Sequence, residues 1–484
     1  MRVLLASSEV HPYSKSGGLA DMVAALAKAL GKAGHQVGLV TPLYRGIRER
    51  FPEVSWFDYW LELPLGRDRL RAEVWTHAAS EGVTVYFIDR PEFYDRSGLY
   101  SEGGWDYPDN PQRFIFFCKG VAHLARYLPG HTEVVHVHDW QAGLVPLLIL
   151  HQRSQGNWKD SPATCLTIHN LAYQGSFARQ YYDLTNLPLD YFHPDGVEFW
   201  GQMNCLKAGL SYADMLTTVS PRYAREITTP EFGCGLDPVL RARHDSLVGI
   251  LNGVDYEEWN TTRNPHLNHP YSIKDLAGKA AGKADLQREM GLPPQPNVPL
   301  FGSITRLADQ KGVDIQLGAL EEMLSSSMQF VMLGSGSPEF ERAYQGLARR
   351  FPSKVSVRIG FNQALSHRIE AASDFFLMPS RFEPCGLNQM YSQRYGAIPI
   401  VRVTGGLDDT ITDLTENKAH ADGIKFRQYG VRALAKAIRK ALVLYQNPDL
   451  FQHMRRNAMR ADFSWDRTCR EYVEVYERIL SRRI

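Results

Sequence analysis

The chain has 484 residues, of which 44% are hydrophobic and 22% charged, and its formal net charge is +1. These values are typical of a globular protein, and at about 150 residues per domain the length predicts two large domains or three smaller ones. No long run of like charge is present, which argues against a nucleic acid or a polybasic membrane patch as the main partner.

The N-terminus and the cysteines indicate a reducing compartment. The first residues meet a charge too early for a signal peptide, and the longest apolar stretch, residues 144–150, is too short to span a membrane. The six cysteines show neither a CxxC pair nor the spacing of a zinc site. We therefore expect a cytoplasmic protein with reduced thiols and no membrane partner.

The first half of the chain predicts one doubly wound α/β domain that ends at residue 252. A short buried strand at 3–6, a loop with two glycines, an Ala- and Leu-rich helix at 21–33 and a second strand at 36–40 follow one another. This is the order of a parallel βαβ unit. A helix is expected at 112–127, and further buried strands are expected at 83–88, 134–137, 165–168, 215–219 and 247–250.

The second half predicts another domain of the same kind. Residues 253–297 are rich in Asn, Pro, His and Lys, and we interpret them as a hinge and lead-in. The second domain is expected over residues 298–463, with strands at 300–304, 330–333, 355–359, 375–378 and 398–401. A last helix, 464–484, is expected to return to the first domain through one stripe: Trp465, Cys469, Tyr472, Tyr476 and Leu480.

The predicted fold class is therefore α/β, with two Rossmann-like doubly wound domains that face each other across a cleft. In such sheets the ligand binds outside the carboxyl ends of the strands. Residues that follow a strand are for this reason the candidates for function.

Two glycine-bearing loops each join a strand to a helix. The first contains Lys15, Gly18 and Asp21, and the second contains Thr404 and Gly405. Glycines let backbone N–H groups approach a phosphate, and a helix N-terminus favours an anion. Neither loop matches GxGxxG, so a dinucleotide is not indicated. A plain turn with solvated side chains is the alternative for both loops.

Charged side chains also follow strands of the second half. Arg306 and Lys311 come after the strand at 300–304, where a pair of cations suits a diphosphate. Glu383 follows the strand at 375–378 and is placed to bind sugar hydroxyls. The alternatives are solvated cations, a surface carboxylate and, for the neighbouring Cys385, a small packed residue rather than a nucleophile.

Two strands of the first half end in histidine. His136 and His138 share a strand face, but no third ligand is placed by spacing, which argues against a metal. A satisfied structural histidine is the ordinary alternative. The residues that follow would suit a sugar, with polar groups for its hydroxyls and an aromatic ring for its face: Asp139, Trp140, His169 and Asn170.

The ordered set of these motifs resembles bacterial glycogen synthases and plant starch synthases, which are retaining glycosyltransferases of the GT-B type. Each motif alone is weak, but the order is specific and covers essentially the whole chain. The resemblance rests on residues 15–21, 138–140, 169–170, 211–214, 218–221, 249–255, 306–312, 380–387, 404–407 and 463–465.

The resemblance implies an enzyme that transfers glucose from ADP-glucose to the non-reducing end of an α-1,4-glucan, without a metal or another cofactor. It implies catalytic roles for Lys15, Asp139, His169, Arg306, Lys311 and Glu383. It implies donor contacts for Gly18, Phe361, Cys385, Gly386, Leu387, Asn388, Thr404 and Gly405. It implies acceptor contacts for Asp21, Trp140 and Asn170.

The chain departs from the family pattern at three positions. Phe361 stands where a tyrosine usually stacks on the base, and Asn388 stands where threonine is frequent. Tyr391 replaces the second of two glutamates, which puts a ribose contact in doubt.

Three other functions remain open at this stage. One is the use of UDP-glucose in the same reaction. Another is a related enzyme of the same fold, such as one that forms sucrose or trehalose. The third is a glucan-binding protein without catalysis, which would have no need for a cation pair and a carboxylate together.

Overall fold

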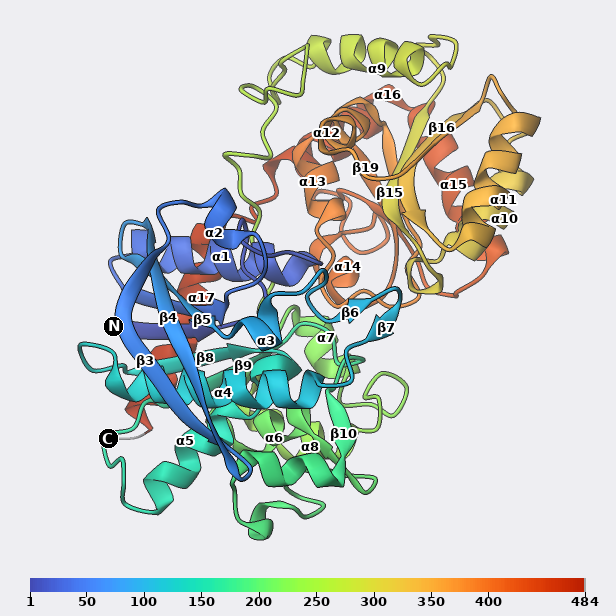
Figure 1. Ribbon diagram of the computed structural model, residues 1–484. Helices are drawn as coiled ribbons and strands as arrows, with labels where there is room; N and C mark the ends of the chain where they lie inside the picture. Colours follow the sequence, from blue (N-terminus) through green and yellow to red (C-terminus); the bar gives the residue numbers. More distant parts are fainter. Residues whose placement is uncertain (483–484) are drawn as a thin grey trace. The chain divides into compact units, whose positions relative to one another are not determined.

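The computed structural model describes residues 1–482, and these residues form two compact units (Figure 1). Unit 1 comprises Met1–Val219, Ala224–Gly253 and residues 465–482, and unit 2 comprises Ser220–Tyr223 and Val254–Ser464. Each unit contains a largely parallel sheet with its own helices, so the predicted class of two doubly wound α/β domains is confirmed. None of the helices within residues 1–482 is both long and apolar enough to cross a membrane.

The main sheet of unit 1 has nine strands, seven of which run parallel to their neighbours. All the strands predicted for this half are present. In order across the sheet they are β14 (Leu247–Gly249), β13 (Met215–Thr218), β9 (Ala163–Ile168), β8 (Val134–His138), β1 (Arg2–Ala6), β2 (Gln36–Pro42), β5 (Val83–Asp89), β4 (Asp68–Ser80) and β3 (Ser55–Leu65).

The hairpin of β3 and β4, the long blue hairpin of Figure 1, was not predicted. β4 runs antiparallel to both β5 and β3, and β3 forms the edge of the sheet. The alternation of buried Leu61, Leu63 and Leu65 with exposed residues is the usual strand signal. It was obscured because Pro64 stands within the run and because the pairing is irregular near Asp58.

The remaining elements of unit 1 cover the sheet or extend its loops. Its α-helices are α1 (Gly18–Lys32), α2 (Ile47–Arg50), α3 (Pro91–Tyr94), α4 (Asn110–Tyr127), α5 (Val145–Ser154), α6 (Cys205–Tyr212), α8 (Asp237–Ala242) and α17 (Trp465–Ser481), while α7 (Pro221–Glu226) begins in unit 2. The short strands are β6 (Ser101–Glu102), β7 (Trp105–Asp106), β10 (Ser176–Ala178), β11 (Glu198–Phe199) and β12 (Gln202–Asn204). Turns of 3₁₀-helix are η1 (Trp140–Ala142), η2 (Arg179–Thr185), η3 (Leu189–Tyr191) and η4 (His244–Ser246).

The last helix, α17, packs in unit 1 through a stripe that differs slightly from the expected one. Cys469, Tyr472 and Tyr476 are buried as expected, but Ile479 rather than Leu480 is the buried residue of the last turn. The difference arises because a helix advances 3.6 residues per turn, so a stripe taken at steps of four drifts off the buried face. The expected helix also included residues 483–484, which lie outside the described part.

Unit 2 has a fully parallel sheet of six strands. Its order is β17 (Val355–Ile359), β16 (Gln329–Gly336), β15 (Leu300–Leu307), β18 (Phe375–Met378), β19 (Ile398–Arg402) and β20 (Ile424–Phe426). The last of these was missed because it is only three residues long. The helices are α9 (Ala277–Glu289), α10 (Val313–Met323), α11 (Pro338–Arg350), α12 (Gln363–Ala372), α13 (Asn388–Arg394), α14 (Gly405–Thr410), α15 (Val431–Tyr445) and α16 (Pro448–Arg460), with the 3₁₀ turn η5 (Asp309–Lys311).

A buried ion network joins the start of this sheet to two of its helices. Asp374 accepts hydrogen bonds from the Leu300 N–H at 3.0 Å, from Lys283 Nζ at 2.7 Å and from Arg455 Nη2 at 2.9 Å. Burial alone would raise the pKa of Asp374, but the two adjacent cations outweigh burial and lower it. The carboxylate therefore stays charged and fixes α9 and α16 to the strand β15.

Replacing Asp374 with asparagine is expected to lower the free energy of unfolding by about 3–5 kcal/mol at pH 7, because two buried cations lose their counter-charge. The folded pKa of Asp374 is depressed, so its stabilisation is present above the unfolded pKa and is lost as the pH falls through the folded pKa. Urea unfolding at several pH values would measure this, and the two proteins should converge in acid. Glu322→Gln, which breaks the exposed pair with Arg439, is the control and should cost at most about 1 kcal/mol. Equal losses in both variants would contradict the argument.

Candidate functional site

The loop between β1 and α1 is held by a buried carboxylate that the sequence analysis did not single out. Glu9 accepts hydrogen bonds from the Ser16 N–H at 2.5 Å, the Ser16 hydroxyl at 2.6 Å and the Gly17 N–H at 3.2 Å. The Tyr100 hydroxyl donates to the same carboxylate at 2.7 Å. Glu9 therefore uses two of the loop amides, and an anion at this loop would be left with the amides that begin α1, from Gly18 onward.

Two sequence candidates of this loop form an exposed ion pair. Lys15 Nζ lies 2.7 Å from the Asp21 carboxylate, and the two side chains are 48% and 39% exposed. The His11 ring lies 3.7 Å from the same carboxylate. Exposed pairs contribute little to stability, about 0–1 kcal/mol. The pair leaves both groups accessible to a ligand.

Asp139 stands in a strained backbone conformation at the carboxyl end of β8. Its φ of 56° and ψ of −170° belong to a region that is almost restricted to glycine and costs about 1–3 kcal/mol. Its N–H donates to the Thr167 carbonyl at 3.0 Å, and its Oδ1 accepts the His169 N–H at 2.7 Å. These two bonds tie the ends of β8 and β9 together and bring Asp139 and His169 to one place.

Burial shifts the protonation of both residues. It raises the pKa of Asp139 to about 7, although hydrogen bonds from the His169 and Asn170 N–H groups act in the opposite direction. Burial lowers the pKa of His169 to about 3, so its ring is neutral at physiological pH. The His169 Nε2 lies 3.1 Å from His138 Nδ1, and one of these nitrogens carries the shared proton. The arrangement offers a carboxyl group that titrates near neutrality beside a neutral imidazole.

His136 has a structural role. Its Nδ1 lies 2.7 Å from the Tyr476 hydroxyl of α17, and its Nε2 lies 2.6 Å from the Thr167 hydroxyl. Burial lowers its pKa to about 3. Both ring nitrogens are therefore engaged in the core, as the structural alternative to a metal ligand anticipated.

Trp140 and Asn170, the expected sugar contacts, also serve the local fold. The half-buried Trp140 ring makes edge contacts with Phe114 and Phe177 at centroid distances of 4.9 and 5.6 Å. A Cβ on Gly175 would lie 2.3 Å from this ring, so glycine is required there. The Asn170 side chain accepts the Ala172 N–H at 3.1 Å. Trp140 thus forms a rigid wall rather than a free ring.

In unit 2 the structure brings Lys311 and Glu383 together. Lys311 Nζ lies 2.6 Å from Glu383 Oε2, and the Ser380 hydroxyl donates to the same oxygen at 3.0 Å. The two side chains are 21% and 8% exposed. Within residues 1–482, Oε1 of Glu383 has no hydrogen-bond partner, so one carboxylate oxygen remains for a ligand.

The turn after Lys311 requires glycine. Gly312 has a φ of 67°, and a Cβ there would lie 2.0 Å from the Pro379 carbonyl oxygen. This close approach places η5 against the end of β18, from which the chain continues to Ser380 and Glu383. It is the local reason why the lysine and the carboxylate meet.

Arg306 and Phe361 project from the same edge of the sheet without covering partners. Arg306 lies near the end of β15 and is exposed, and within the described residues no carboxylate lies within ion-pair distance of its guanidinium. Phe361 follows β17 and is 88% exposed. A free guanidinium can bind phosphate, and a free ring can stack on a base.

The loop of Cys385, Gly386, Leu387 and Asn388 is packed tightly against the second glycine loop. Cys385 is buried, and the Gly406 N–H donates to the Glu383 carbonyl at 3.1 Å. A Cβ on Gly405 would lie 1.9 Å from that carbonyl oxygen. These glycines therefore serve the contact between two loops, in addition to the phosphate role that the sequence analysis assigned to Gly405 and Thr404.

Three further contacts support this region, and sequence reasoning missed all of them. The Ser220 hydroxyl donates to the Pro384 carbonyl at 2.8 Å, and Arg222 pairs with Asp408 at 3.0 Å. The Asn388 side chain donates to the Ile304 carbonyl of β15 at 2.7 Å. The residues concerned are far apart in the sequence, so only the fold could reveal the contacts.

Tyr391, the position that departs from the family pattern, is packed within unit 2. Its ring stacks on Trp259 with a centroid distance of 3.6 Å and an interplanar angle of 5°. Trp259 also stacks on His367 at 4.1 Å. The tyrosine therefore contributes to the packing of α13 against the segment of unit 2 that precedes α9.

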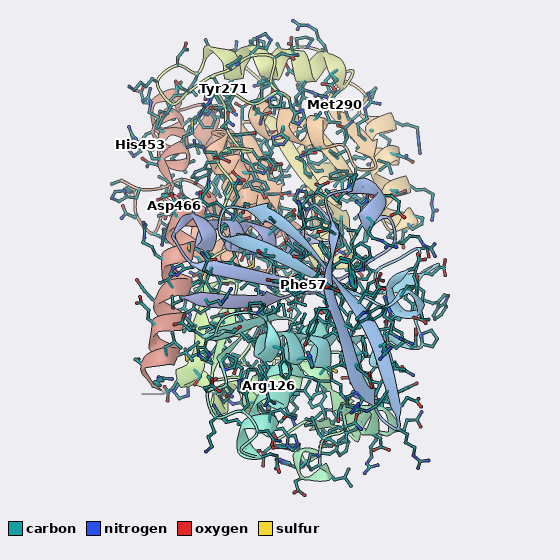
Figure 2. All side chains as sticks on the ribbon, turned by 60° about the vertical axis from the view of Figure 1, so that its left-hand side comes forward. Phe57, Arg126, Tyr271, Met290, His453 and Asp466 are labelled. Atoms are coloured by element: carbon teal, nitrogen blue, oxygen red, sulfur yellow. The ribbon has the colours of Figure 1, made fainter. Side chains whose placement is uncertain are left out.

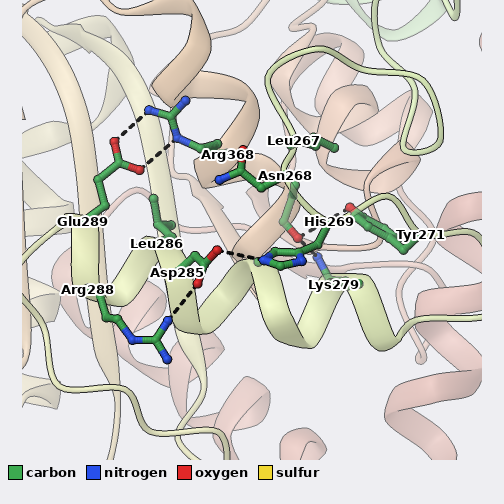
Figure 3. Close-up of a pocket in the computed structure, with 13 residues that line it drawn as sticks. Leu267, Asn268, His269, Tyr271, Lys279, Asp285, Leu286, Arg288, Glu289 and Arg368 are labelled. Carbon is green, nitrogen blue, oxygen red and sulfur yellow. Dashed lines mark hydrogen bonds and ion pairs between the residues drawn. The ribbon is translucent and has the colours of Figure 1, made fainter.

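A separate pocket of about 260 Å³ lies between α9, α12 and the loop before α9 (Figure 3). Apart from Lys279, its charged or titratable side chains form ion pairs: Asp285 with His269 and Arg288, and Glu289 with Arg368. Lys279 donates instead to the carbonyls of Ala371, Ser373 and Tyr395. The pocket lies near the start of β18, since its residue Ala371 precedes that strand. Lys311 and Glu383, in contrast, follow the carboxyl ends of β15 and β18. The pocket therefore contains none of the candidate site residues.

Comparisons with known proteins identify the family of both halves of the chain. Residues 2–242 match the family described as starch synthase catalytic domain, and residues 289–460 match the family described as glycosyl transferases group 1. A glycogen synthase of Anaeromyxobacter sp. (strain Fw109-5) is 46% identical over 98% of this chain and 99% of its own length.

Two solved structures are similar as well. The catalytic domain of starch synthase IV from Arabidopsis thaliana, bound to ADP and acarbose, has a TM-score of 0.89 and 33% identity, with 99% of each chain covered. A sucrose-phosphate synthase from Thermosynechococcus elongatus has a TM-score of 0.61 and 16% identity, with 99% of each chain covered, and shares the fold.

The raised pKa of Asp139 gives a test of its environment. Its folded pKa is about 7, whereas an unfolded aspartate titrates near about 4, so the folded state holds a proton that the unfolded state has lost. Stability from this group therefore falls as the pH rises from about 4 to 7 and is constant above 7. Asp139→Asn should remove this slope, as measured by urea unfolding of both proteins at pH 5, 6, 7 and 8.

The buried histidines do not confuse this comparison. His136 and His169 have lowered pKa values and give the opposite slope, but the variant retains both, so their effect cancels in the difference. Asparagine also keeps the acceptor for the His169 N–H. Parallel stability curves for the two proteins would contradict the assignment.

Proposed function

The chain belongs to the family of bacterial glycogen synthases and starch synthases, and we propose that it transfers glucose from ADP-glucose to the non-reducing end of an α-1,4-glucan with retention. It is a hexosyltransferase with two GT-B-type α/β units. The ADP-glucose donor and the roles of individual residues are the parts that we infer.

The observation that supports a nucleotide-sugar donor is the Lys311–Glu383 pair, which follows the carboxyl ends of β15 and β18, together with the free Arg306 near the end of β15. Lys311 uses one N–H on Glu383, which leaves two for phosphate oxygens. Arg306 adds a fork of donors without losing an internal partner. In our proposal these cations hold the diphosphate and stabilise the leaving group. The amides near Leu387 and Asn388 complete its contacts.

Glu383 is proposed to bind the donor glucose. Its Oε2 is fixed by Lys311 and Ser380, so its Oε1 is directed by the same contacts and is free to accept a sugar hydroxyl. The two loops that contain Cys385 and Gly386, and Thr404 and Gly405, would together hold this carboxylate in place. A group held in position before the ligand arrives binds at lower entropic cost.

The residues of unit 1 are proposed to serve the sugars. Asp139 and His169 offer a carboxyl that titrates near neutrality and a neutral ring, and Trp140 and Asn170 offer a wall and an amide. Lys15 and Asp21 lie on an exposed loop, with the Gly18 amide available to an anion. These groups suit the hydroxyls of a glucan acceptor and the transferred glucose.

We infer a front-face displacement for the transfer. The bond between C1 and the phosphate oxygen breaks, and the diphosphate leaves with the electron pair, neutralised by Arg306 and Lys311. The acceptor 4-hydroxyl then forms its bond to the same face of C1, and its proton passes to the departing phosphate. No side chain of the candidate set is a strong nucleophile, which favours this route over a covalent intermediate.

Nucleoside diphosphate release on glycogen, with ADP-glucose or UDP-glucose as donor, tests the proposed donor. ADP-glucose is expected to give a kcat/KM at least about tenfold higher, because the exposed Phe361 ring stacks better on a purine. Phe361→Ala should raise KM for ADP-glucose by about tenfold with little change in kcat, and Phe361→Tyr should retain KM. Equal or faster turnover with UDP-glucose would contradict the proposed donor.

Arg306→Ala and Lys311→Ala are expected to differ in stability but not in catalysis. Each should lower kcat by about 10²–10³-fold, because each removes a fixed cation from the leaving group. Arg306→Ala should leave the midpoint of thermal unfolding nearly unchanged, since the guanidinium has no internal partner in the described residues. Lys311→Ala should lower it, because Glu383 becomes a buried, unpaired charge.

Activity assays and thermal unfolding of both variants would check this pair of outcomes. Arg439→Ala, which removes an exposed arginine that pairs with Glu322, is the matched control and should change neither property appreciably. Near-normal turnover in both site variants would refute the assignment of a diphosphate clamp.

A further inference from the structure

Three tryptophans gather on the outward face of the β3–β4 hairpin of unit 1. Trp56 and Trp60 are 45% and 51% exposed, and their ring centroids lie 6.3 Å apart. Trp56 pairs with Trp75 across the hairpin, and Trp60 pairs with Glu73. We call the face formed by Trp56, Trp60, Trp75, Glu73 and Arg48 the tryptophan surface. Large exposed apolar groups that cluster in this way mark an interaction site.

A bulge in β3 creates this surface. The pairing advances from Trp56–Trp75 to Tyr59–Val74, so Phe57 and Asp58 are extra residues in the strand. Asp58 has a φ of 54°, an uncommon conformation for a residue other than glycine. Without these two extra residues, the regular alternation of the strand would change the spacing of the Trp56 and Trp60 rings.

The bulge is anchored from the inner side. Phe57, labelled in Figure 2, packs on Tyr86 with a centroid distance of 5.4 Å, and the Tyr59 hydroxyl lies 2.8 Å from His123 Nε2. Phe57 and Tyr59 therefore point into contacts, while the rings of Trp56 and Trp60 are about half exposed to solvent. The fold holds the exposed pair in a defined position.

Polar groups are interleaved with the rings. The Trp75 indole N–H donates to Glu73 Oε2 at 3.0 Å, and the Arg48 guanidinium lies 4.6 Å above the Trp75 ring. A sugar ring has a face of C–H groups and a rim of hydroxyls. Aromatic faces beside a carboxylate and a guanidinium match both features.

The edge strand is protected against pairing with a second copy of the chain. The bulge, the charged Asp58 and Glu62, and Pro64 are the devices by which proteins prevent strand addition at a sheet edge. The rings therefore project beside an edge that resists another strand. This argues for a ligand that binds through side chains rather than through the backbone.

We propose that the tryptophan surface is a second glucan-binding site, formed by residues other than those of the candidate active site. The identity of the polymer rests on the proposed function. The planes of Trp56 and Trp60 are inclined by 71°, so they form no flat platform. A straight, ribbon-like chain would contact only one ring, whereas an α-1,4-glucan turns between successive residues and can contact both.

A second site would act through the polymer. Glycogen presents many chain ends, and a molecule already attached at one place meets the others at a raised effective concentration. The resulting gain in affinity should appear with glycogen and should vanish with an acceptor that is too short to occupy both sites. The surface would thus lower KM for the polymer without changing the chemical step.

The test compares the wild-type chain with the double variant Trp56→Ala/Trp60→Ala. In gels that contain glycogen, and in the absence of any donor, the variant should bind at least about tenfold more weakly. Its KM for glycogen should rise by at least about tenfold, while kcat and the KM for maltotriose stay unchanged. Trp200→Ala, which removes an 85% exposed ring next to β11, is the control and should behave as the wild type.

Several outcomes would overturn the proposal. Unchanged glycogen binding would do so, as would equally strong retention in gels that contain a soluble β-1,4-glucan. A wild-type dimer that dissociates in the double variant, measured by sedimentation, would assign the surface to a second copy instead. Trp60→Phe, which keeps a ring, should retain most binding and separates loss of the surface from loss of folding. Binding without glucose transfer would refute the proposed function but leave this site standing.

Discussion

The carboxyl ends of parallel strands lie along one edge of a sheet, and the candidate site depends on this constraint in both units. In unit 1 the ends of β1, β8 and β9 carry the Lys15 loop, Asp139 and His169. In unit 2 the ends of β15 and β18 carry Arg306, Lys311 and Glu383, although as many as 77 positions separate these residues in the sequence. Hydrogen bonding of the strands therefore decides which side chains become neighbours.

Three buried carboxylates then fix the loops that leave those edges. Glu9 accepts hydrogen bonds from amides of the first loop, and Asp139 accepts one from the His169 N–H. Glu383 accepts hydrogen bonds from Lys311 and Ser380. Each carboxylate thus binds fixed groups of the protein in place of water. The loops are consequently held in shape before a ligand binds, which lowers the entropic cost of binding.

The sequence predicted the parallel strands and the strand-end candidates because both depend on local pattern: buried runs, and the residues directly after them. It did not predict β3, whose alternation is broken by Pro64 and by the bulge at Phe57 and Asp58. It also missed the contacts of Glu9, Ser220 and Arg222, because their partners become visible only when strands have paired. Gly405 was predicted as a phosphate contact from its place in a strand-to-helix loop, but its close approach to the backbone of Glu383 could be recognised only in the fold.

The composition of the two units has a consequence for biosynthesis. Unit 1 takes its last helix, α17, from the end of the chain, and unit 2 takes Ser220–Tyr223 from within the first half. Until the ribosome has produced α17, the ring of His136 lacks the Tyr476 hydroxyl, and β9 and α1 lack the helix that packs on them. The N-terminal half therefore cannot complete its fold during translation, and no single cut of the gene yields two intact fragments.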